Sequence, residues 1–177
     1  MFYSQIGQDE FVFNTASKYL STKKDFTFLD IGCQDYEHIN NTYYLEKVHN
    51  WRGVAIDIDG QWSQNWINNR KNSVFVATDA TTADYGKILQ DNNMPTVIDY
   101  LSLDLEPPPL TLKALHRLLE YNYTFNIVTY ETDYYRENEY GVDSLRKPSQ
   151  DLFKSKGYVL VQEGRQDDFY IHSSLLT

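Results

Sequence analysis

Apolar and polar positions along the chain alternate between two spacings. Short runs such as FTFLDIG (26–32) and RGVAIDID (52–59) are rich in β-branched and aromatic residues and end at glycine or acidic residues, which is typical of strands. Between these runs, segments such as PLTLKALHRLLEYN (109–122) carry apolar residues at helical spacing. The pattern predicts strands at 26–32, 52–59, 73–80, 96–105, 125–131, 158–164 and 167–173, and helices at 9–20, 40–50, 61–70, 82–90, 109–122 and 144–157.

The order of these elements defines the fold class. Strands that alternate with helices predict an α/β protein with a mostly parallel sheet and helices on both faces. The last two strands are separated by a short turn, so we expect them to pair as a hairpin that adds an antiparallel strand. The length of 177 residues predicts a single domain over 1–177, with 1–22 as an N-terminal helical segment, whether or not it belongs to a larger protein.

Composition narrows the classes of partner. The net charge of -9 argues against nucleic acid or an anionic membrane surface as the main partner. No apolar run approaches the roughly 20 residues that a membrane span needs, and the N-terminus has no basic region followed by an apolar stretch. We therefore expect no membrane span, no signal peptide and a cytoplasmic location. Cys33 is the single cysteine, which excludes an internal disulfide.

Each of the first five predicted strands brings an acid to the same edge of the sheet. These acids are Asp30, Asp57 with Asp59, Asp79, Asp104 with Glu106, and Glu131 with Asp133. Ligands of parallel α/β sheets bind at the carboxyl ends of the strands. Acids also favour helix N-termini, which explains any single position about equally well. Five acidic strand ends at one edge favour a binding site.

The loop after the first strand, DIGCQDYE (30–37), restricts the ligand. A dinucleotide needs backbone amides around its pyrophosphate and hence the pattern G-x-G-x-x-G, but this loop has one glycine. Asp35 and Glu37 would repel phosphates, and no P-loop is present. A cofactor with a cationic centre, a ribose and no phosphate fits better, and S-adenosylmethionine has this chemistry.

The spacing of the acids assigns parts of this cofactor to them. Asp57 lies 27 residues after Asp30, which suits an acid that accepts from the ribose hydroxyls at the end of the second strand. Asp79 could accept from the adenine amino group. Asp30 and Gly32 would lie beside the methionine part.

Several ordered segments carry a family resemblance. They are SQIGQD (4–9), FLDIGCQD (28–35), NNTYYLEK (40–47), WRGVAIDID (51–59), NNR (68–70), IDYLSLDLE (98–106), IVTYE (127–131) and DDFYIH (167–172). Over nearly its whole length the chain resembles the FkbM-type S-adenosylmethionine-dependent methyltransferases. The resemblance implies a Rossmann-like class I methyltransferase fold with a seven-stranded sheet and one antiparallel strand. It also implies O-methylation, often of sugars in glycans or glycosylated natural products, and fusion or association with glycosyltransferases.

The resemblance also assigns residues by position. It implies a cofactor site made of Asp30, Gly32, Cys33, Asp35, Asn41, Asp57, Ile58, Asp79 and Ala80, with Gln5 and Gln8 closing over the cofactor. The chain departs from the family pattern at Tyr36, Asp57-Ile58, Pro107 and Thr132, where the family usually has Gly, Glu-Pro, Gly and His. The last two departures touch the acceptor side, so the base is less well defined than the cofactor site.

The acceptor side allows two mechanisms, because a sugar hydroxyl needs a base or a metal ion to lose its proton. Asp104 and Glu106 share a face if the strand persists, and Glu131 ends the adjacent strand. One of these three acids could be the general base, with a pKa raised by its neighbours. Alternatively, Asp104, Glu131 and Asp133 could hold Mg²⁺ or another divalent cation. Pairing with arginines is a third reading for Glu106 and Asp133.

The segment DYYRENEY (133–140) follows the fifth strand and is rich in tyrosine and charge. Asp133, Tyr134, Tyr135 and Arg136 could stack on and hydrogen-bond a sugar, or could form a solvated loop. Three hypotheses therefore stay open: a sugar O-methyltransferase, a Rossmann enzyme that binds NAD or a nucleotide sugar, and a non-catalytic module that binds carbohydrate or a partner through this loop.

Overall fold

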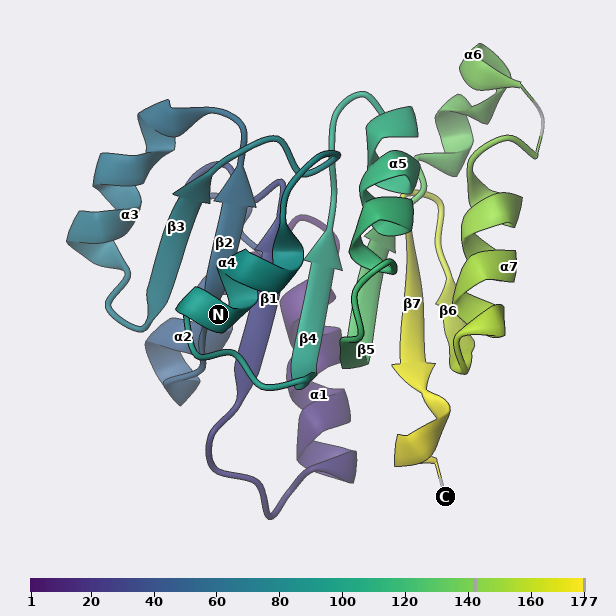
Figure 1. Ribbon diagram of the computed structural model, residues 1–177. Helices are drawn as coiled ribbons and strands as arrows, with labels where there is room; N and C mark the ends of the chain where they lie inside the picture. The colour runs from purple at the N-terminus through teal and green to yellow at the C-terminus, as the bar shows by residue number, and fades with distance from the viewer. Residues whose placement is uncertain (142, 177) are drawn as a thin grey trace.

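A computed structural model describes residues 1–141 and 143–176, which form one sheet with helices on both faces (Figure 1). The sheet has seven strands in the order β3-β2-β1-β4-β5-β7-β6. The strands are β1 (Thr27–Ile31), β2 (Arg52–Asp57), β3 (Ser73–Ala77), β4 (Val97–Leu103), β5 (Thr124–Glu131), β6 (Tyr158–Glu163) and β7 (Asp167–His172). All seven predicted strands are confirmed, with ends that differ by a few residues.

The direction of the strands confirms the predicted sheet. Strands β1 to β5 pair in parallel, and β7 is antiparallel to both β5 and β6. The carboxyl ends of the five parallel strands therefore meet at the upper edge in Figure 1. Because β7 runs the other way, its first residues reach the same edge, where Asp167 lies opposite Glu131.

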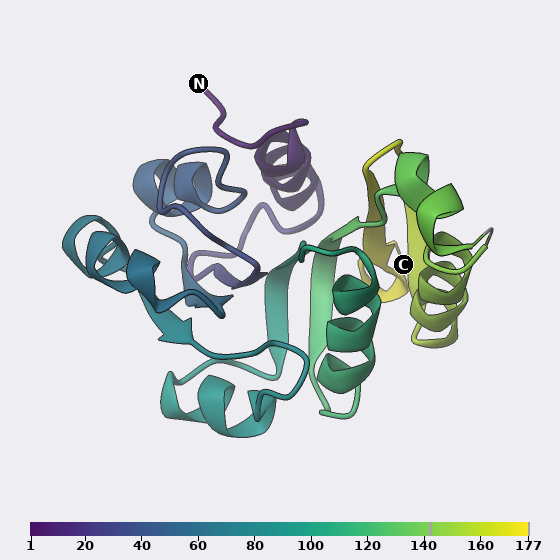
Figure 2. The same ribbon diagram turned by 90° about the horizontal axis from the view of Figure 1, so that it is seen from above.

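Helices cover both faces of the sheet (Figure 2). One face carries α1 (Gln8–Tyr19), α2 (Tyr43–His49) and α3 (Ser63–Asn69); the other carries α4 (Tyr85–Asp91), α5 (Pro109–Leu118) and α7 (Arg146–Ser155). Short 3₁₀ helices lie at Gly60–Trp62, Tyr134–Arg136 and Ser173–Leu175. None of the helices within 1–141 and 143–176 has the length and apolar character that a bilayer crossing requires.

The segment after β5 differs from the prediction. It was expected to be a loop, but Tyr134–Arg136 forms a 3₁₀ turn (η2) and Glu137–Tyr140 forms α6. These helices are too short to show a periodic apolar pattern in the sequence. Arg136 stabilises them by donating from Nη2 to the hydroxyl of Tyr140 at 3.1 Å.

Alternate residues of the central strands enter two cores. Phe28, Tyr100 and Ile127 are fully buried with α1 and α2. Their neighbours Leu29 and Val128 are fully buried on the opposite face. Because side chains alternate along a strand, Asp30 points to the same face as Phe28, toward the segment that leads into α2.

Candidate active site

A cavity of about 390 Å³ opens at the carboxyl edge of the sheet. Its lining includes Gln5, Asp30, Gly32, Cys33, Asp35 and Asn41 of the predicted cofactor set, and Asp104, Glu106, Glu131, Asp133 and Tyr135 of the predicted acceptor set. Of the other predicted residues, Gln8, Asp57, Ile58, Asp79, Ala80, Tyr134 and Arg136 lie outside this lining. A larger hollow of about 540 Å³ between α1 and β6–β7 has Glu10 and Lys18 as its charged lining residues, so it gathers no comparable chemistry.

Gly32 lets the ends of β1 and β4 approach each other. Its φ is +85°, and a Cβ atom at this position would lie 1.6 Å from the carbonyl oxygen of Asp104. The backbone amide of Gly32 donates to the carbonyl of Ile56 at 2.8 Å. The single glycine of the loop is therefore required by the packing of three strand ends.

Asp30 is a buried acid with partners inside the protein. The hydroxyl of Thr42 donates to Asp30 Oδ2 at 2.8 Å. Burial raises the pKa of Asp30 to about 6, against the opposing effects of Thr42 and Arg70. Nearby, Asn41 is buried and donates from Nδ2 to Ser102 Oγ at 3.0 Å. Both residues line the part of the cavity for which cofactor binding was predicted, which we call the cofactor end; their cofactor role stays a prediction.

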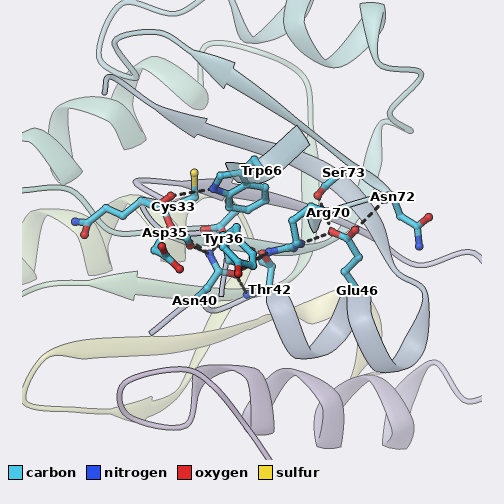
Figure 3. Close-up of polar contacts among 12 residues, drawn as sticks. Cys33, Asp35, Tyr36, Asn40, Thr42, Glu46, Trp66, Arg70, Asn72 and Ser73 are labelled. Atoms are coloured by element: carbon cyan, nitrogen blue, oxygen red, sulfur yellow. Dashed lines mark hydrogen bonds and ion pairs between the residues drawn. The ribbon is translucent and has the colours of Figure 1, made fainter. Parts of the chain in front are cut away.

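The loop 32–41 is held from behind by residues that the sequence analysis did not single out (Figure 3). Arg70, which follows α3, pairs with Glu46 of α2 with 2.6 Å between Nε and Oε2. Trp66 of α3 donates from Nε1 to the carbonyl of Gln34 at 2.9 Å. Asn40 donates to the carbonyls of the loop itself. These residues lie in or beside the segments NNTYYLEK and NNR, which carried the resemblance and of which only Asn41 had an assigned role.

Two predicted cofactor acids, Asp57 and Asp79, accept hydrogen bonds from backbone amides in the free protein; their cofactor roles stay predictions. Asp57 accepts from the amide of Gln34 at 3.0 Å and from that of Asp59 at 2.9 Å, so it fixes the loops after β1 and β2. Asp79 accepts from the amide of Thr81 at 2.8 Å, and this bond lowers its pKa.

The two apolar members of the predicted cofactor set also lie outside the cavity. Ile58 follows β2 with 73% of its surface exposed. Ala80 is buried, and its carbonyl accepts from the hydroxyl of Tyr85 at 2.8 Å. Neither residue lines the cavity, so their predicted roles stay predictions.

Asp104 and Glu131 form the carboxyl pair of the acceptor end. Their side chains share a hydrogen bond. Burial raises the pKa of Glu131, and the hydrogen bond to Asp104 and the charges of Asp104 and Asp133 raise it further. Burial raises the pKa of Asp104 as well, so the pair as a whole holds a proton that the two carboxyls share.

Two more acids lie beside this pair. Asp133 is 1% exposed, and its Oδ1 has no hydrogen-bond partner, while its Oδ2 lies 3.1 Å from Arg136 Nη1. Asp167 is buried, and burial together with the charge of Asp104 raises its pKa to about 7. The sequence analysis missed Asp167, although the segment DDFYIH was part of the resemblance. The acceptor end is therefore strongly acidic.

Gln8 does not line the cavity, where it was predicted to close over the cofactor. Its Nε2 donates to Asp167 Oδ2 at 2.9 Å, which ties the start of α1 to β7. Gln5, from the same predicted pair, does line the cavity.

Glu106 does not share a face with Asp104. Strand β4 ends at Leu103, and the Glu106–Pro107 peptide bond is cis. The Glu106 side chain is 56% exposed and accepts from Arg136 Nη1 at 2.7 Å. The prolines do end the strand, and α5 begins at Pro109 as predicted.

The residues present do not form a metal site as they lie. Among residues 1–141 and 143–176, no three His, Cys, Asp or Glu side chains converge as ligands of one ion. Asp104, Glu131 and Asp133, the predicted metal ligands, do not converge in this way either. We therefore derive no catalytic step through a metal ion.

Tyr135 lines the cavity, whereas its neighbours Tyr134 and Arg136 do not. The guanidinium of Arg146 lies 4.2 Å from the ring centroid of Tyr134. Arg136 forms ion pairs with Glu106, Asp133 and Glu139.

The fold is similar to that of solved methyltransferases. N-methyltransferase NodS from Bradyrhizobium japonicum matches with a TM-score of 0.52 at 14% identity, over 92% of each chain. A TehB-like S-adenosylmethionine-dependent methyltransferase from Corynebacterium glutamicum matches with 0.54 at 12% identity, over 95% of this chain and 89% of that chain. M. capricolum TrmK, solved with S-adenosylhomocysteine, matches with 0.53 at 14% identity, over 90% and 65%.

No family model matches the chain, and no curated protein sequence matches it. The similarities to solved structures, together with the strand order, show the Rossmann-like class I methyltransferase fold that the sequence predicted. At these low identities the similarity extends to the fold alone and not to the methyl acceptor or to a particular methyltransferase family.

Proposed function

We propose that this protein is an S-adenosylmethionine-dependent O-methyltransferase that acts on a sugar hydroxyl of a glycan or glycoconjugate. The observation that carries the proposal is the Asp104–Glu131 carboxyl pair, which lines the same cavity as the loop after β1. The FkbM-type resemblance suggests the sugar as the acceptor class.

The cofactor end suits a cation without phosphates. Asp30 and Asp35 line it, and none of the described lining residues is a lysine or arginine. A pyrophosphate would be repelled there, whereas a sulfonium and an ammonium group would be attracted. The strand order, with antiparallel β7 between β5 and β6, also differs from that of dinucleotide-binding sheets. These observations weigh against the NAD or nucleotide-sugar alternative.

The proposed chemistry is an in-line transfer. S-adenosylmethionine supplies a methyl group on a positively charged sulfur, which becomes a neutral thioether when the carbon–sulfur bond breaks. The chain aligns the acceptor oxygen and removes its proton. In the proposed mechanism Glu131 holds the shared proton, and Asp104 accepts the hydroxyl proton as the new oxygen–carbon bond forms.

The acceptor end favours a neutral acceptor over a polyanion. Asp104, Glu131 and Asp133 surround it, and the whole chain has a net charge of -9. Phosphate groups of a nucleic acid would be repelled, whereas sugar hydroxyls can donate to the carboxylates. Tyr135 lines the cavity and is 46% exposed, so its ring offers a face for a sugar.

A divalent cation is the second candidate for activating the hydroxyl. Glu131 Oε2 and Asp133 Oδ1 are buried without hydrogen-bond partners, which favours some positively charged or donating group between them. The present arrangement of side chains does not supply three ligands, so this candidate requires rearrangement.

The test is methyl transfer from labelled S-adenosylmethionine to a panel of glycans that contain deoxyhexoses, with and without EDTA. We expect labelled sugar in both conditions; loss of activity in EDTA that returns with Mg²⁺ would favour the metal mechanism instead. Calorimetry with S-adenosylhomocysteine and with NAD tests the cofactor. Binding of S-adenosylhomocysteine without turnover on any acceptor would favour a non-catalytic module.

A further inference from the structure

The loop 32–41 has a backbone shape that its own residues disfavour. Gln34 has a φ of 45° and Ile39 a φ of 55°, and a β-branched residue such as isoleucine is rarely found in this left-handed region. The loop nevertheless supplies eight of the residues that line the cavity. Contacts from elsewhere in the fold must therefore hold it in this shape.

Arg70 supplies most of those contacts (Figure 3). It is 3% exposed and does not line the cavity. Its Nη1 donates to the carbonyl of Tyr36 at 2.9 Å and to Asn40 Oδ1 at 3.1 Å. Its Nη2 donates to Thr42 Oγ1 at 3.1 Å, and Glu46 accepts from Nε and neutralises the charge. Each branch of the guanidinium thus has an acceptor in or next to the loop.

Aromatic rings fix the plane of this guanidinium. Its Cζ lies 4.3 Å from a ring centroid of Trp66, 5.6 Å from that of Tyr43 and 5.8 Å from that of Phe28. Trp66 also donates to the carbonyl of Gln34, one of the two strained residues. A lysine could pair with a carboxylate here, but it lacks the planar fork and the stacking surface of arginine.

Two side chains transmit the position of Arg70 to the cavity. The hydroxyl of Thr42 accepts from Arg70 and donates to Asp30 Oδ2. Asn40 accepts from Arg70 and donates from Nδ2 to the carbonyls of Cys33 and Asp35, both at 3.1 Å. Each of these three partners, Asp30, Cys33 and Asp35, lines the cavity.

We propose that Arg70 is a positioning residue of the cofactor site, which acts through Thr42 and Asn40 to hold Asp30 and the loop 32–41 in the shape that binds cofactor. The identity of the ligand rests on the proposed function. The role of Arg70 in shaping the loop does not, because it follows from contacts within the free protein.

The first test compares Arg70→Lys with the matched variant Arg52→Lys. Arg52 is the first residue of β2, at the end of the strand away from the cavity, and it donates to the carbonyl of Asn93 at 3.1 Å. Both variants therefore keep the positive charge and remove the planar guanidinium. We expect S-adenosylhomocysteine to bind Arg70→Lys at least tenfold more weakly than wild type, and Arg52→Lys within twofold. Wild-type affinity in a folded Arg70→Lys protein would overturn the proposal.

The second test remains informative if Arg70→Lys fails to fold. Thr42 is fully buried, and its hydroxyl is the link between Arg70 and Asp30. Thr42→Ser keeps this hydroxyl, whereas Thr42→Val keeps the shape without it. We expect Thr42→Ser to bind S-adenosylhomocysteine within threefold of wild type and Thr42→Val at least tenfold more weakly. Equal losses in the two variants contradict the relay.

Hydrogen exchange of the ligand-free protein separates this proposal from the proposed function. We expect faster exchange in Arg70→Lys at the amides of 32–41, with unchanged protection in β4 and β5. If wild type does not bind S-adenosylhomocysteine, the proposed function fails while this measurement still tests Arg70. Faster exchange spread evenly over the whole sheet would indicate general destabilisation and would overturn the positioning role.

Discussion

The two ends of the cavity differ in how their buried polar atoms are paired. At the cofactor end, Asp30, Asn40 and Arg70 have partners within the protein. At the acceptor end, Glu131 Oε2 and Asp133 Oδ1 are buried without a hydrogen bond. A buried polar atom without a partner costs free energy, so a ligand that donates to these two oxygens would stabilise the acceptor end. The polar groups at the cofactor end are thus paired in the free protein, whereas two oxygens at the acceptor end are left for a ligand to pair.

The two ends also differ in charge balance. At the cofactor end, the buried cation Arg70 is matched by Glu46. At the acceptor end, Arg136 pairs with Asp133 and is shared with Glu106 and Glu139. Asp104 and Glu131 have no ion pair with a residue that the structure describes. Protonation of one carboxylate reduces the repulsion among these acids, and the raised pKa of Glu131 shows that its protonated form is favoured. The following variants break or sharpen this contrast, in order of decreasing expected effect.

Asp104→Asn should have the largest effect, because it removes the proposed base from the acceptor end. Removing a general base lowers turnover by about 10²- to 10⁴-fold. We expect such a loss in kcat, with S-adenosylhomocysteine affinity within about threefold of wild type, measured by labelled methyl transfer and calorimetry. The control is Glu106→Gln, an exposed acid paired with Arg136, which should keep most activity. Loss of cofactor binding in Asp104→Asn would instead place Asp104 at the cofactor end.

Gly32→Ala should disrupt the cofactor end. The added Cβ would lie 1.6 Å from the Asp104 carbonyl oxygen, so the ends of β1 and β4 must separate. We expect a loss of about 3 kcal/mol in the free energy of unfolding, measured by urea denaturation. The control Gly60→Ala places its Cβ 3.7 Å from the nearest atom, Ala77 Cβ, and should be neutral. Equal stabilities of the two variants would contradict the close approach.

Asp30→Asn should change how stability depends on pH. The pKa of Asp30 is raised to about 6, so the native state keeps its proton longer than the unfolded state. The contribution of Asp30 to stability is therefore fully present below about pH 4 and is lost as pH rises through 6, by about 3 kcal/mol. Urea denaturation of the ligand-free protein should show a smaller fall between these values in Asp30→Asn. An identical pH dependence in both proteins would contradict the raised pKa.

Glu131→Gln should have the smallest effect of the four. Because Glu131 holds the shared proton in the proposed mechanism, a neutral glutamine in its place can still donate to Asp104. We expect kcat within about tenfold of wild type, whereas Glu131→Ala should lose more because Asp104 loses its donor. If both variants are equally inactive and activity depends on added Mg²⁺, a metal ligand role for Glu131 is the better explanation.

The cofactor end was the more predictable of the two. Asp30 lies near the end of β1, and Gly32 and Cys33 follow that strand directly, so their place in the sequence determines their place at the sheet edge. Asp57 ends β2 and Asp79 follows β3, but their carboxylates accept from backbone amides. Those amides belong to loops whose course depends on packing, so a count along the sequence cannot assign these acids.

The acceptor end needed the tertiary structure. Asp167 reaches it because β7 is antiparallel and starts where β5 ends, with Asp167 opposite Glu131. Glu106 lines the same cavity, but β4 ends before it at Leu103 and its exposed carboxylate pairs with Arg136. Neither outcome follows from the spacing of acids in one segment.

The sequence alone therefore determined the elements, the fold class and the acidic edge, because local periodicity and strand-end position are encoded within a few residues. Only the tertiary structure decided which acids share a proton and which bond to backbone amides. It also showed that Arg70, 40 residues along the chain from Asp30, helps to place it through Thr42. Such pairing depends on distances in space and on burial, which change the free energy of a charge without leaving a trace in the local sequence.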